Sequence, residues 1–334
     1  IDVIEEAKES KKLLESQKLV KDVLDIYIRT HIDQELKVGQ SRDGRKRQLI
    51  TYLKPFFSNY LSEISRSELQ SIIDAKQSEG KVVMANRICA AIRAFTGWAH
   101  RRGYIENDVS RALQKAGKEN SRDRTPSLEE VKVIWSASFK MGNLWGPYIR
   151  LCILTGQRCR SDILEMKWSW INFERSFYEI PNPKNGRPHN VHLSTPTMNE
   201  ILYLQELQAE NPSLFVFTTT GKTAASGLSK AKLKLDALIL DILAKKGREK
   251  LFEPWVLHDL RRSQATALAE AGFDEGVVDR IQNHVASGSR ASTVAAVYNK
   301  AQKLPQRASA LDAWAGMVLG EHSNVINLSA GRKS

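Results

Sequence analysis

The chain has 334 residues, 42% of them hydrophobic, and its 50 Lys and Arg against 38 Asp and Glu give a net charge of +12. This length suggests about two domains, and the apolar share suffices for real hydrophobic cores. The positive charge favours a polyanionic partner without separating DNA, RNA and anionic membranes. The sequence contains no run of eighteen apolar residues and no secretory signal segment, so we expect a cytoplasmic protein rather than a membrane-spanning or exported one.

The three cysteines, Cys89, Cys152 and Cys159, are odd in number and lack the spacing of metal ligands. We interpret them as free thiols in a reducing compartment, and we expect neither a metal nor a cofactor. The chain starts with Ile1, which indicates a piece of a longer protein.

Helical patterning dominates the first third of the chain. Residues 1–17 are charged and weakly periodic and predict a lead-in segment, whereas apolar residues recur at intervals of three and four over 18–115. Ser65 and Glu68 have the spacing of a capping box, which predicts the start of a helix, and Gly103 is a suitable residue to follow the end of another. We therefore predict a compact helical bundle over 18–115.

Basic residues form clusters on the predicted helices of this bundle. Such clusters suit the phosphates spaced along a duplex, and they give salt-dependent affinity more than sequence choice. Any one of these side chains, taken alone, would count as ordinary solvated surface. The candidate DNA contacts are Arg42, Arg45, Lys46, Arg47, Lys81, Arg87, Arg93 and Arg101.

A polar stretch separates the bundle from the rest of the chain. Residues 116–125 hold no apolar side chain after Ala116 and predict an extended linker. Ser127 and Glu130 form a second capping-box pattern, so we expect a second domain over 126–304.

An apolar helix predicted over 148–154 leads directly into the sequence Thr-Gly-Gln-Arg158. Gly156 breaks the helix there and lets the chain turn to present Arg158. Asp162 belongs to the helical pattern that follows, and it could orient Arg158 through a bidentate pair or merely cap and solvate its helix. Arg160 is a rival for the role of Arg158, with plain surface as its alternative.

Two strand patterns, 177–180 and 190–193, flank the sequence Pro-Asn-Pro-Lys184-Asn-Gly, in which Asn-Gly is a strong hairpin signal. A lysine near a hairpin tip can swing over a DNA backbone and protonate a leaving oxygen, although Lys184 by itself would count as a turn residue. Arg187 is the nearby alternative. The scaffold predicted beyond the hairpin consists of helices over 195–207 and 228–243 and a short buried strand over 214–217.

The sequence Trp-Val-Leu-His258-Asp-Leu-Arg261 places a histidine and an arginine three positions apart. On a helix, side chains at this spacing lie on one face and can bind one anion together. His258 can donate to a phosphate oxygen, and the planar guanidinium of Arg261 can grip the same group. The adjacent Arg262 could as easily be structural.

Two further residues complete a phosphate-handling set. His284 stands in the sequence Gln-Asn-His284, and Tyr298 follows a run of small and β-branched residues that predicts a short helix. A free tyrosine hydroxyl has a pKa of about 10 and is a poor nucleophile at neutral pH, so nearby positive charge is needed to activate it.

Taken together and in this order, the sequences Thr-Gly-Gln-Arg158, His258-Asp-Leu-Arg261, Asn-His284 and Val-Tyr298 resemble the active-site boxes of tyrosine recombinases, specifically phage-type integrases. The match of order and gaps is far more specific than any single box. The resemblance implies that Tyr298 cleaves one DNA strand and keeps the 3′ phosphate, while the 5′ hydroxyl leaves with a proton from Lys184. The remaining catalytic residues that it implies are Arg158, His258, Arg261 and His284, with Asp162 in support.

The sequence departs from the family pattern in three places. Asp162 follows Arg158 by four positions where the family usually has three, as though one residue were inserted. Asn283 replaces the glycine of a Leu-Gly-His-like box, and the spacing from His284 to Tyr298 is longer than in many members. A prophage-integrase branch has this longer form.

The resemblance also implies the architecture: a mainly α fold with a small β-sheet, in which an all-helical core-binding domain over 18–115 precedes a catalytic α+β domain over 126–304. Residues 305–334 are expected to form a C-terminal helix and tail that docks on its own domain or on a neighbouring protomer. An arm-binding domain of the kind that many phage integrases carry is not visible.

The function implied is site-specific recombination at double-stranded DNA attachment sites, which integrates or excises a phage or mobile element. The expected enzyme is a homotetramer on DNA, assisted by DNA-bending accessory proteins, in the nucleoid of a bacterial host and away from membranes. A resolvase, an invertase or a type IB topoisomerase of the same chemistry is one alternative. A catalytically degenerate, sequence-specific DNA-binding protein is the other.

Overall fold

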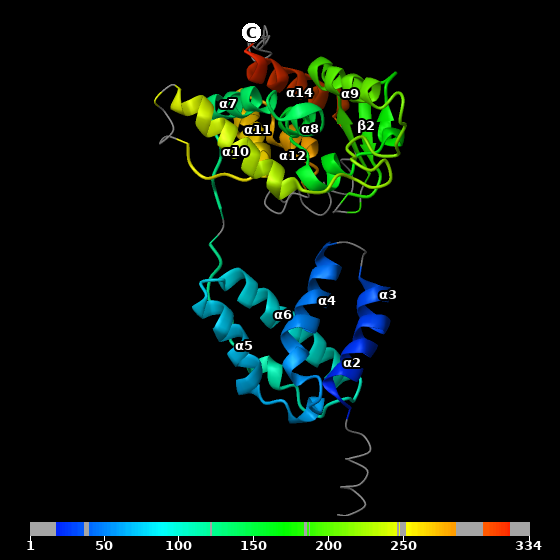
Figure 1. The fold of residues 1–334 in the computed structure, drawn as a ribbon, viewed down its shortest axis with the longest axis vertical. Helices are drawn as coiled ribbons and strands as arrows, with labels where there is room; N and C mark the ends of the chain where they lie inside the picture. Colours follow the sequence, from blue (N-terminus) through cyan, green and yellow to red (C-terminus); the bar gives the residue numbers. More distant parts are fainter. Residues whose placement is uncertain are drawn as a thin grey trace, which may run out of the picture. The chain divides into compact units, whose positions relative to one another are not determined.

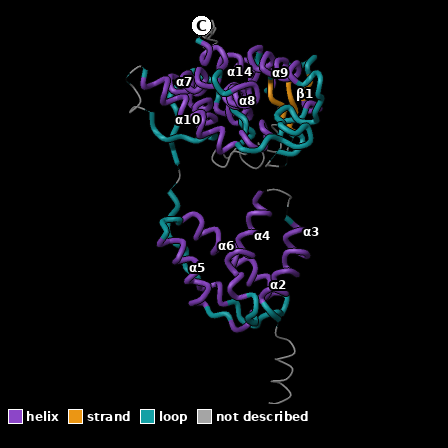
Figure 2. The backbone as a smooth tube through the Cα atoms, in the orientation of Figure 1, coloured by secondary structure: helices purple, strands orange, loops and turns teal. Residues whose placement is uncertain are grey.

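The computed structural model describes residues 18–36, 40–120, 122–183, 186, 188–245, 247, 252–284 and 303–320. The chain divides into two compact units, Ile1–Arg122 and Asp123–Ser334, each with its own hydrophobic core (Figure 1). Helices predominate, and the strands gather in one part of the second unit (Figure 2). No helix within the described ranges is long and apolar enough to cross a membrane.

Helices form the described part of the first unit, as predicted, together with one isolated bridge between Leu19 and Tyr60. Ser65 and Glu68 form the expected capping box, with the Glu68 N–H donating to Ser65 Oγ at 3.3 Å and the Ser65 N–H donating to Glu68 Oε2 at 2.8 Å. Gly103 follows the end of α6 with a φ of +74°, which confirms it as a helix stop. The elements are α2 (Val20–Tyr27), the π-helix η1 (Ile28–Ile32), α3 (Asp33–Glu35), α4 (Gln40–Leu53), η2 (Lys54–Phe56), η3 (Leu61–Glu63), α5 (Arg66–Ser78), α6 (Val82–Arg101) and η4 (Val109–Ala112).

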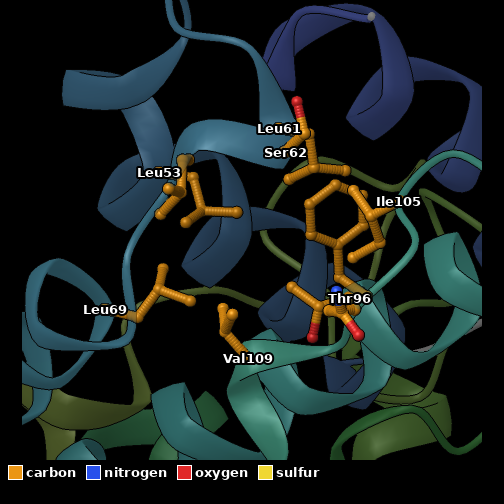
Figure 3. A pocket seen from close by; sticks show the side chains of 10 residues that line it. Leu53, Leu61, Ser62, Leu69, Thr96, Ile105 and Val109 are labelled. Atoms are coloured by element: carbon orange, nitrogen blue, oxygen red, sulfur yellow. The ribbon is translucent and has the colours of Figure 1, made fainter. Parts of the chain in front are cut away.

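Helix α6 runs through the core of this unit and packs against α2, α4 and α5. Its Phe95 and Trp98 contact the ring of Tyr27, with centroids 5.4 and 5.1 Å away. A cavity of about 20 Å³ lies in the same core, between Leu69 and Thr96 among other residues (Figure 3). This volume holds about one water molecule, so the cavity is a packing gap rather than a ligand site.

The second unit is helical around a three-stranded antiparallel sheet in the order β1-β2-β3, which confirms the predicted fold class. Tyr178 on β2 pairs with Val191 on β3, and both side chains are buried in the core. The elements are α7 (Leu128–Ser138), α8 (Gly142–Thr155), the π-helix η5 (Cys159–Leu164), η6 (Trp168–Trp170), β1 (Ile171–Asn172), β2 (Phe177–Ile180), β3 (His189–His192), α9 (Thr195–Leu207), α10 (Leu228–Ala244), α11 (Asp259–Glu270), α12 (Glu275–Ile281) and α14 (Leu304–Leu319).

The strand predicted over 214–217 was wrong. Only a single bridge forms there, between Phe215 and Lys167. The pairing stops there because the N–H of Met166 donates to the carbonyl oxygen of Ile163 at 3.0 Å, and the carbonyl oxygen of Val216 accepts from Nε2 of Gln208 at 2.7 Å. The strand β3 also begins one residue earlier than predicted, at His189.

The C-terminal helix α14 packs on its own unit, where it contacts α7, α8, α11, α12 and β3. Trp314 is fully buried, and its Nε1 donates to the carbonyl oxygen of Ile153 on α8 at 2.8 Å. In this single chain, α14 therefore packs on its own unit, and docking on a neighbouring protomer stays a prediction. Residues 321–334 lie outside the described part of the chain.

Candidate active site

The loop that carries Arg158 is shaped by Gly156. This glycine ends α8 with a φ of +61°, and its N–H donates to the carbonyl oxygen of Cys152 at 3.2 Å. A Cβ at this position would lie 1.9 Å from Oε1 of the buried Gln264. Both the left-handed backbone and the close approach of Gln264 require glycine, and they direct the chain from α8 into Arg158.

The π-helix after Arg158 accounts for the extra residue in this box. The N–H of Ile163 donates to the carbonyl oxygen of Arg158 at 3.2 Å, and the N–H of Glu165 donates to that of Arg160 at 3.3 Å, both five residues back. A π turn accommodates one more residue than an α turn. The π turn therefore brings Asp162 next to Arg158, although Asp162 stands four positions later instead of the usual three.

Asp162 is fully buried and binds Arg158 through one oxygen. Its Oδ2 accepts from the backbone N–H of Arg158 at 3.2 Å and from Nη1 of the same residue at 3.3 Å. The contact therefore orients Arg158, although only one guanidinium nitrogen takes part and the pair is not the bidentate fork considered from the sequence. The rival Arg160 is exposed to solvent.

Arg261 lies on α11 with only 2% of its surface exposed. Its Nη1 donates to the carbonyl oxygen of Gly156 at 2.8 Å, and its Nη2 donates to the carbonyl oxygen of Gln282. The side chain of Gln282 returns a bond of 2.5 Å to the carbonyl oxygen of Arg261. Burial and the charge of Arg158 lower the pKa of Arg261 to about 10, so the guanidinium stays protonated at neutral pH.

His258 precedes α11 as its N-cap residue and is exposed to solvent, one turn from Arg261. Burial of part of the ring and the charge of Arg261 lower the pKa of His258 below its ordinary value. The imidazole is therefore neutral at pH 7 and can donate one N–H to an anion. Arg262, the next residue, is half-buried, and a structural role remains the alternative for it.

His284 is positioned by the way α12 ends. The N–H of His284 donates to the carbonyl oxygen of Asp279 at 2.9 Å and that of Asn283 to Arg280 at 3.2 Å, which together form a Schellman motif. Asn283 occupies the left-handed position with a φ of +50°, a conformation that asparagine tolerates better than most residues. This explains why asparagine can stand where the family pattern has glycine.

The side chain of His284 is half-exposed, with Nδ1 3.5 Å from Oδ1 of Asp279. Partial burial and the charge of Arg261 lower its pKa. Since Arg158 also contributes to this shift and to that of His258, the two guanidinium groups and the two imidazoles share one electrostatic environment. This arrangement favours a bound anion with several oxygen acceptors.

The predicted nucleophile Tyr298 and the predicted general acid Lys184 lie outside the described residues, as does Arg187. The structure therefore tests none of these three assignments. It describes the strands β2 and β3 that flank the hairpin of Lys184, and the helix α14 that follows the segment of Tyr298.

Two glutamines of the site were not predicted as functional from the sequence. Gln157 is buried and donates from Nε2 to the carbonyl oxygens of Thr155 at 3.0 Å and Ile281 at 2.7 Å. Gln282 holds Arg261 through its backbone and its side chain. Each stands inside a recognised box, next to Arg158 or two residues before His284, and that adjacency is the signal that could have indicated a supporting role.

The basic residues of the first unit differ in their surroundings. Arg42 and Lys46 on α4 contact the carboxylate of Asp33, Arg42 with a separation of 3.7 Å. Arg93 on α6 differs from the others because it donates to backbone carbonyls of η4 and the segment after it, including Ser110 at 3.3 Å. Nε and Nη2 of Arg93 thus serve the scaffold of the unit, and its role as a DNA contact stays a prediction.

Other candidates remain accessible to a phosphate. Lys81 pairs with Glu79 at 2.7 Å on the surface, and such an exposed pair is readily exchanged for another anion. The candidates that the structure leaves exposed at the surface are Arg47, Lys81, Arg87 and Arg101. Arg45 is half-buried beside Tyr27.

The fold and the described part of the site, which holds Arg158, His258, Arg261 and His284, define a tyrosine recombinase. Such an enzyme transfers DNA strands. The family model described as "Phage integrase family" matches residues 128–304, more than half of the chain, and the chain belongs to this family.

Curated relatives agree with this assignment. The chain is 26% identical to "Tyrosine recombinase XerA" of Pyrococcus horikoshii, over 77% of this chain and 86% of the relative. It is 24% identical to "Prophage integrase IntA" of Escherichia coli K12 over 80% of this chain, and it spans 62% of that relative's length.

Solved structures share the fold. A lambda integrase(75-356) dimer bound to a COC′ core site superposes with a TM-score of 0.61 at 17% identity, covering 80% of this chain and 96% of the other. The Tn1549 transposon integrase in complex with circular intermediate DNA superposes with a TM-score of 0.56 at 13% identity, covering 84% and 99%. At these identities the likeness shows the fold alone.

Proposed function

We propose that this chain is a site-specific integrase that cleaves and rejoins duplex DNA through Tyr298, and so integrates or excises a phage or other mobile element. The observation that carries the proposal is the pair of guanidinium groups, Arg158 held by Asp162 and Arg261 held by Gly156 and Gln282, in the charge environment of two neutral histidines. Fixed donors of this kind stabilise the charge that develops on a phosphate in the transition state.

The proposed step is a transesterification. Tyr298 gives up its hydroxyl proton to water as its oxygen attacks phosphorus, the bond to the 5′ oxygen breaks, and a proton from Lys184 neutralises that oxygen as it leaves. The 3′ phosphate remains on the tyrosine, and attack by the 5′ hydroxyl of a new partner strand reverses the step. The energy of the phosphodiester bond is conserved, so the reaction needs no nucleotide cofactor.

The first unit is proposed to bind duplex DNA together with the catalytic unit. Four of its basic candidates stay exposed, and phosphate contacts of this kind position a protein on DNA. Structural neighbours include a lambda integrase tetramer bound to a Holliday junction, which supports a tetramer of this chain on its DNA. The C-terminal helix and tail over 305–334 would then include the contact between protomers, and the enzyme would work in the cytoplasm of its host.

Trapping on a nicked DNA substrate tests the proposed chemistry. The protein is incubated with DNA that carries the candidate attachment sequence, and covalent adducts are resolved on a denaturing gel. We expect an adduct with the parent and none with Tyr298→Phe. The matched control is Tyr203→Phe, which removes the hydroxyl of an exposed tyrosine on α9 and should leave the adduct intact.

The same experiment has outcomes that contradict the proposal. An adduct that survives in Tyr298→Phe would show that another residue is the nucleophile. Tight binding to the correct site without an adduct in the parent would favour a catalytically degenerate DNA-binding protein.

A resolvase or invertase with the same chemistry is the second candidate function. The observation behind it is the similarity to the XerA relatives, which are named recombinases and not integrases. A plasmid with two sites distinguishes the two. Joining of separate DNA molecules supports the integrase, whereas deletion or inversion confined to one molecule supports a resolvase or invertase. Relaxation of supercoils without exchange supports a topoisomerase.

A further inference from the structure

The carbonyl oxygen of Ile281, the last residue of α12, is a meeting point for three segments of the second unit. It accepts from Nε2 of Gln157 at 2.7 Å and from Nε2 of His189 at 2.9 Å. The next carbonyl, that of Gln282, accepts from Arg261. The end of α12 therefore joins the loop of Arg158, the helix of Arg261 and the first residue of β3.

His189 is buried, with 5% of its surface exposed, and its bonds define the state of its ring. Burial and the nearby charge of Arg307 lower its pKa to about 3, so the ring is neutral. Because Nε2 carries the hydrogen donated to Ile281, Nδ1 is left as an acceptor. Nη2 of Arg307 lies 3.5 Å from this Nδ1 and also donates to the carbonyl oxygen of Asn190.

Arg307 belongs to the first turn of α14, and only 3% of its surface is exposed. Burial, with the charge of Arg280 adding, lowers its pKa to about 10, which leaves the guanidinium charged at neutral pH. A charged group buried this deeply is costly without hydrogen bonds, and His189 and Asn190 are two of the partners that hold it. Helix α14 is the first element described after the segment of Tyr298.

We propose that His189 and Arg307 are positioning residues that couple the docking of α14 to the geometry of the phosphate site. With α14 docked, Arg307 fixes the ring of His189, and the ring fixes the carbonyl of Ile281 that also holds Gln157. Without that contact the ring loses its second anchor, so its bond to Ile281 is held less firmly, next to the residues that hold Arg158 and Arg261. The proposal rests on the proposed function, since it concerns the rate of the same cleavage step.

A second link between the same two elements provides a matched control. Nε2 of His192 on β3 lies 3.1 Å from Oδ1 of Asp312 on α14. This pair is at the surface, with 26% and 55% of the side chains exposed, and it does not touch Ile281. An exposed pair of this kind contributes little to stability. Its loss therefore reports on a contact between β3 and α14 that does not involve His189 or Arg307.

The experiment compares Arg307→Met, His189→Leu, His189→Gln and the control Asp312→Asn in the full chain. Adduct formation is followed in a single turnover at saturating nicked DNA, and DNA affinity and thermal stability are measured separately. We expect Arg307→Met and His189→Leu to slow adduct formation roughly 10- to 100-fold, because small misplacements of catalytic groups have effects of this size. DNA affinity should change by no more than about twofold, and Asp312→Asn should match the parent.

His189→Gln separates positioning from simple packing. The glutamine amide can supply a donor to Ile281 and an acceptor to Arg307, which leucine cannot, so we expect it to retain more activity than His189→Leu at similar stability. Equal cleavage rates for parent, Arg307→Met and His189→Leu would overturn the proposal. The proposal would also be overturned if the rate of adduct formation fell only in proportion to the fraction of folded protein and His189→Gln and His189→Leu were equally slow.

Nitrogen NMR of the imidazole rings gives a readout that needs no activity. In the parent, His189 should be neutral, protonated at Nε2 and slow to exchange that proton. In Arg307→Met the proton should exchange faster, whereas in Asp312→Asn it should not. If the parent forms no adduct on any substrate, the proposed function fails. This measurement still decides whether Arg307 fixes the ring of His189.

Discussion

Arg261 donates from Nη1 to the carbonyl oxygen of Gly156 at 2.8 Å, across 105 positions of the chain. The contact ties the helix of the second box to the turn that presents Arg158, so the two guanidinium groups are placed by one backbone feature. A conformational change at Gly156 would therefore disturb both arginines at once, which makes this turn the most sensitive point of the described site.

Replacement of Gly156 by alanine should be severely destabilising. The left-handed backbone costs an alanine about 1–2 kcal/mol, and the Cβ would meet Gln264 at 1.9 Å, which adds about 1–3 kcal/mol of overpacking. We expect the free energy of unfolding, measured with urea, to fall by their sum. The control is Gly221→Ala, where φ is +73° but no atom lies within 4 Å of the added Cβ. Equal losses at both positions would contradict a role for the contact with Gln264.

Arg261→Lys should slow adduct formation by about 10²–10³-fold, the usual effect of removing one donor that stabilises transition-state charge. A lysine keeps the charge but cannot reach Gly156 and Gln282 with a planar fork. Single-turnover cleavage at saturating DNA is the measurement. Arg160→Lys, at the exposed rival position, should stay within about threefold of the parent, and a larger effect there would mean that the first arginine had been wrongly assigned.

Asp162→Asn tests the orienting contact on Arg158. The substitution removes the charge from a fully buried group whose Oδ2 accepts two hydrogen bonds, so we expect a loss of about 1–3 kcal/mol in the free energy of unfolding. Cleavage should fall as well, because Arg158 loses the partner that fixes it. Asp241→Asn, which breaks an exposed pair with Lys245, should change neither quantity measurably. Full activity in Asp162→Asn would remove Asp162 from the site.

The buried His189 should make stability depend on pH. Its folded pKa of about 3 lies below the unfolded value of about 6.5, so on acidification the unfolded state takes up the proton first. The parent should therefore lose about 2–3 kcal/mol relative to His189→Gln between about pH 7 and about pH 4.5, with no relative change above about pH 7. Urea unfolding of both proteins across this range is the measurement. Parallel pH profiles would show that folding does not lower the pKa of His189.

Local patterns in the sequence predicted most of the elements. The capping boxes at Ser65 and Ser127 marked helix starts because side chain and backbone satisfy each other within four residues. The hairpin strands were found to within one residue for the same reason, since alternation and Asn-Gly are local signals. The strand expected over 214–217 did not form because the groups that would extend its single bridge are bonded elsewhere, the N–H of Met166 to Ile163 and the carbonyl of Val216 to Gln208.

The irregularities of the catalytic boxes could be seen in the sequence but explained only with the structure. The extra residue before Asp162 is accommodated by a π turn, and Asn283 suits the left-handed end of a Schellman motif. Both depend on backbone conformation, which residue types restrict without determining.

The sequence by itself determined the family, the mainly helical fold and the identity of Arg158, His258, Arg261 and His284 as candidates, because these rest on residue types in a fixed order. Only the tertiary structure decided how they are held. Gln157, His189, Gln282 and Arg307 meet through backbone carbonyls, and every residue has a carbonyl, so no pattern of side chains could indicate which ones would be used. The packing of α14 on its own unit also came only from the structure. The sequence shows that this helix has an apolar face, but it does not show which surface that face covers.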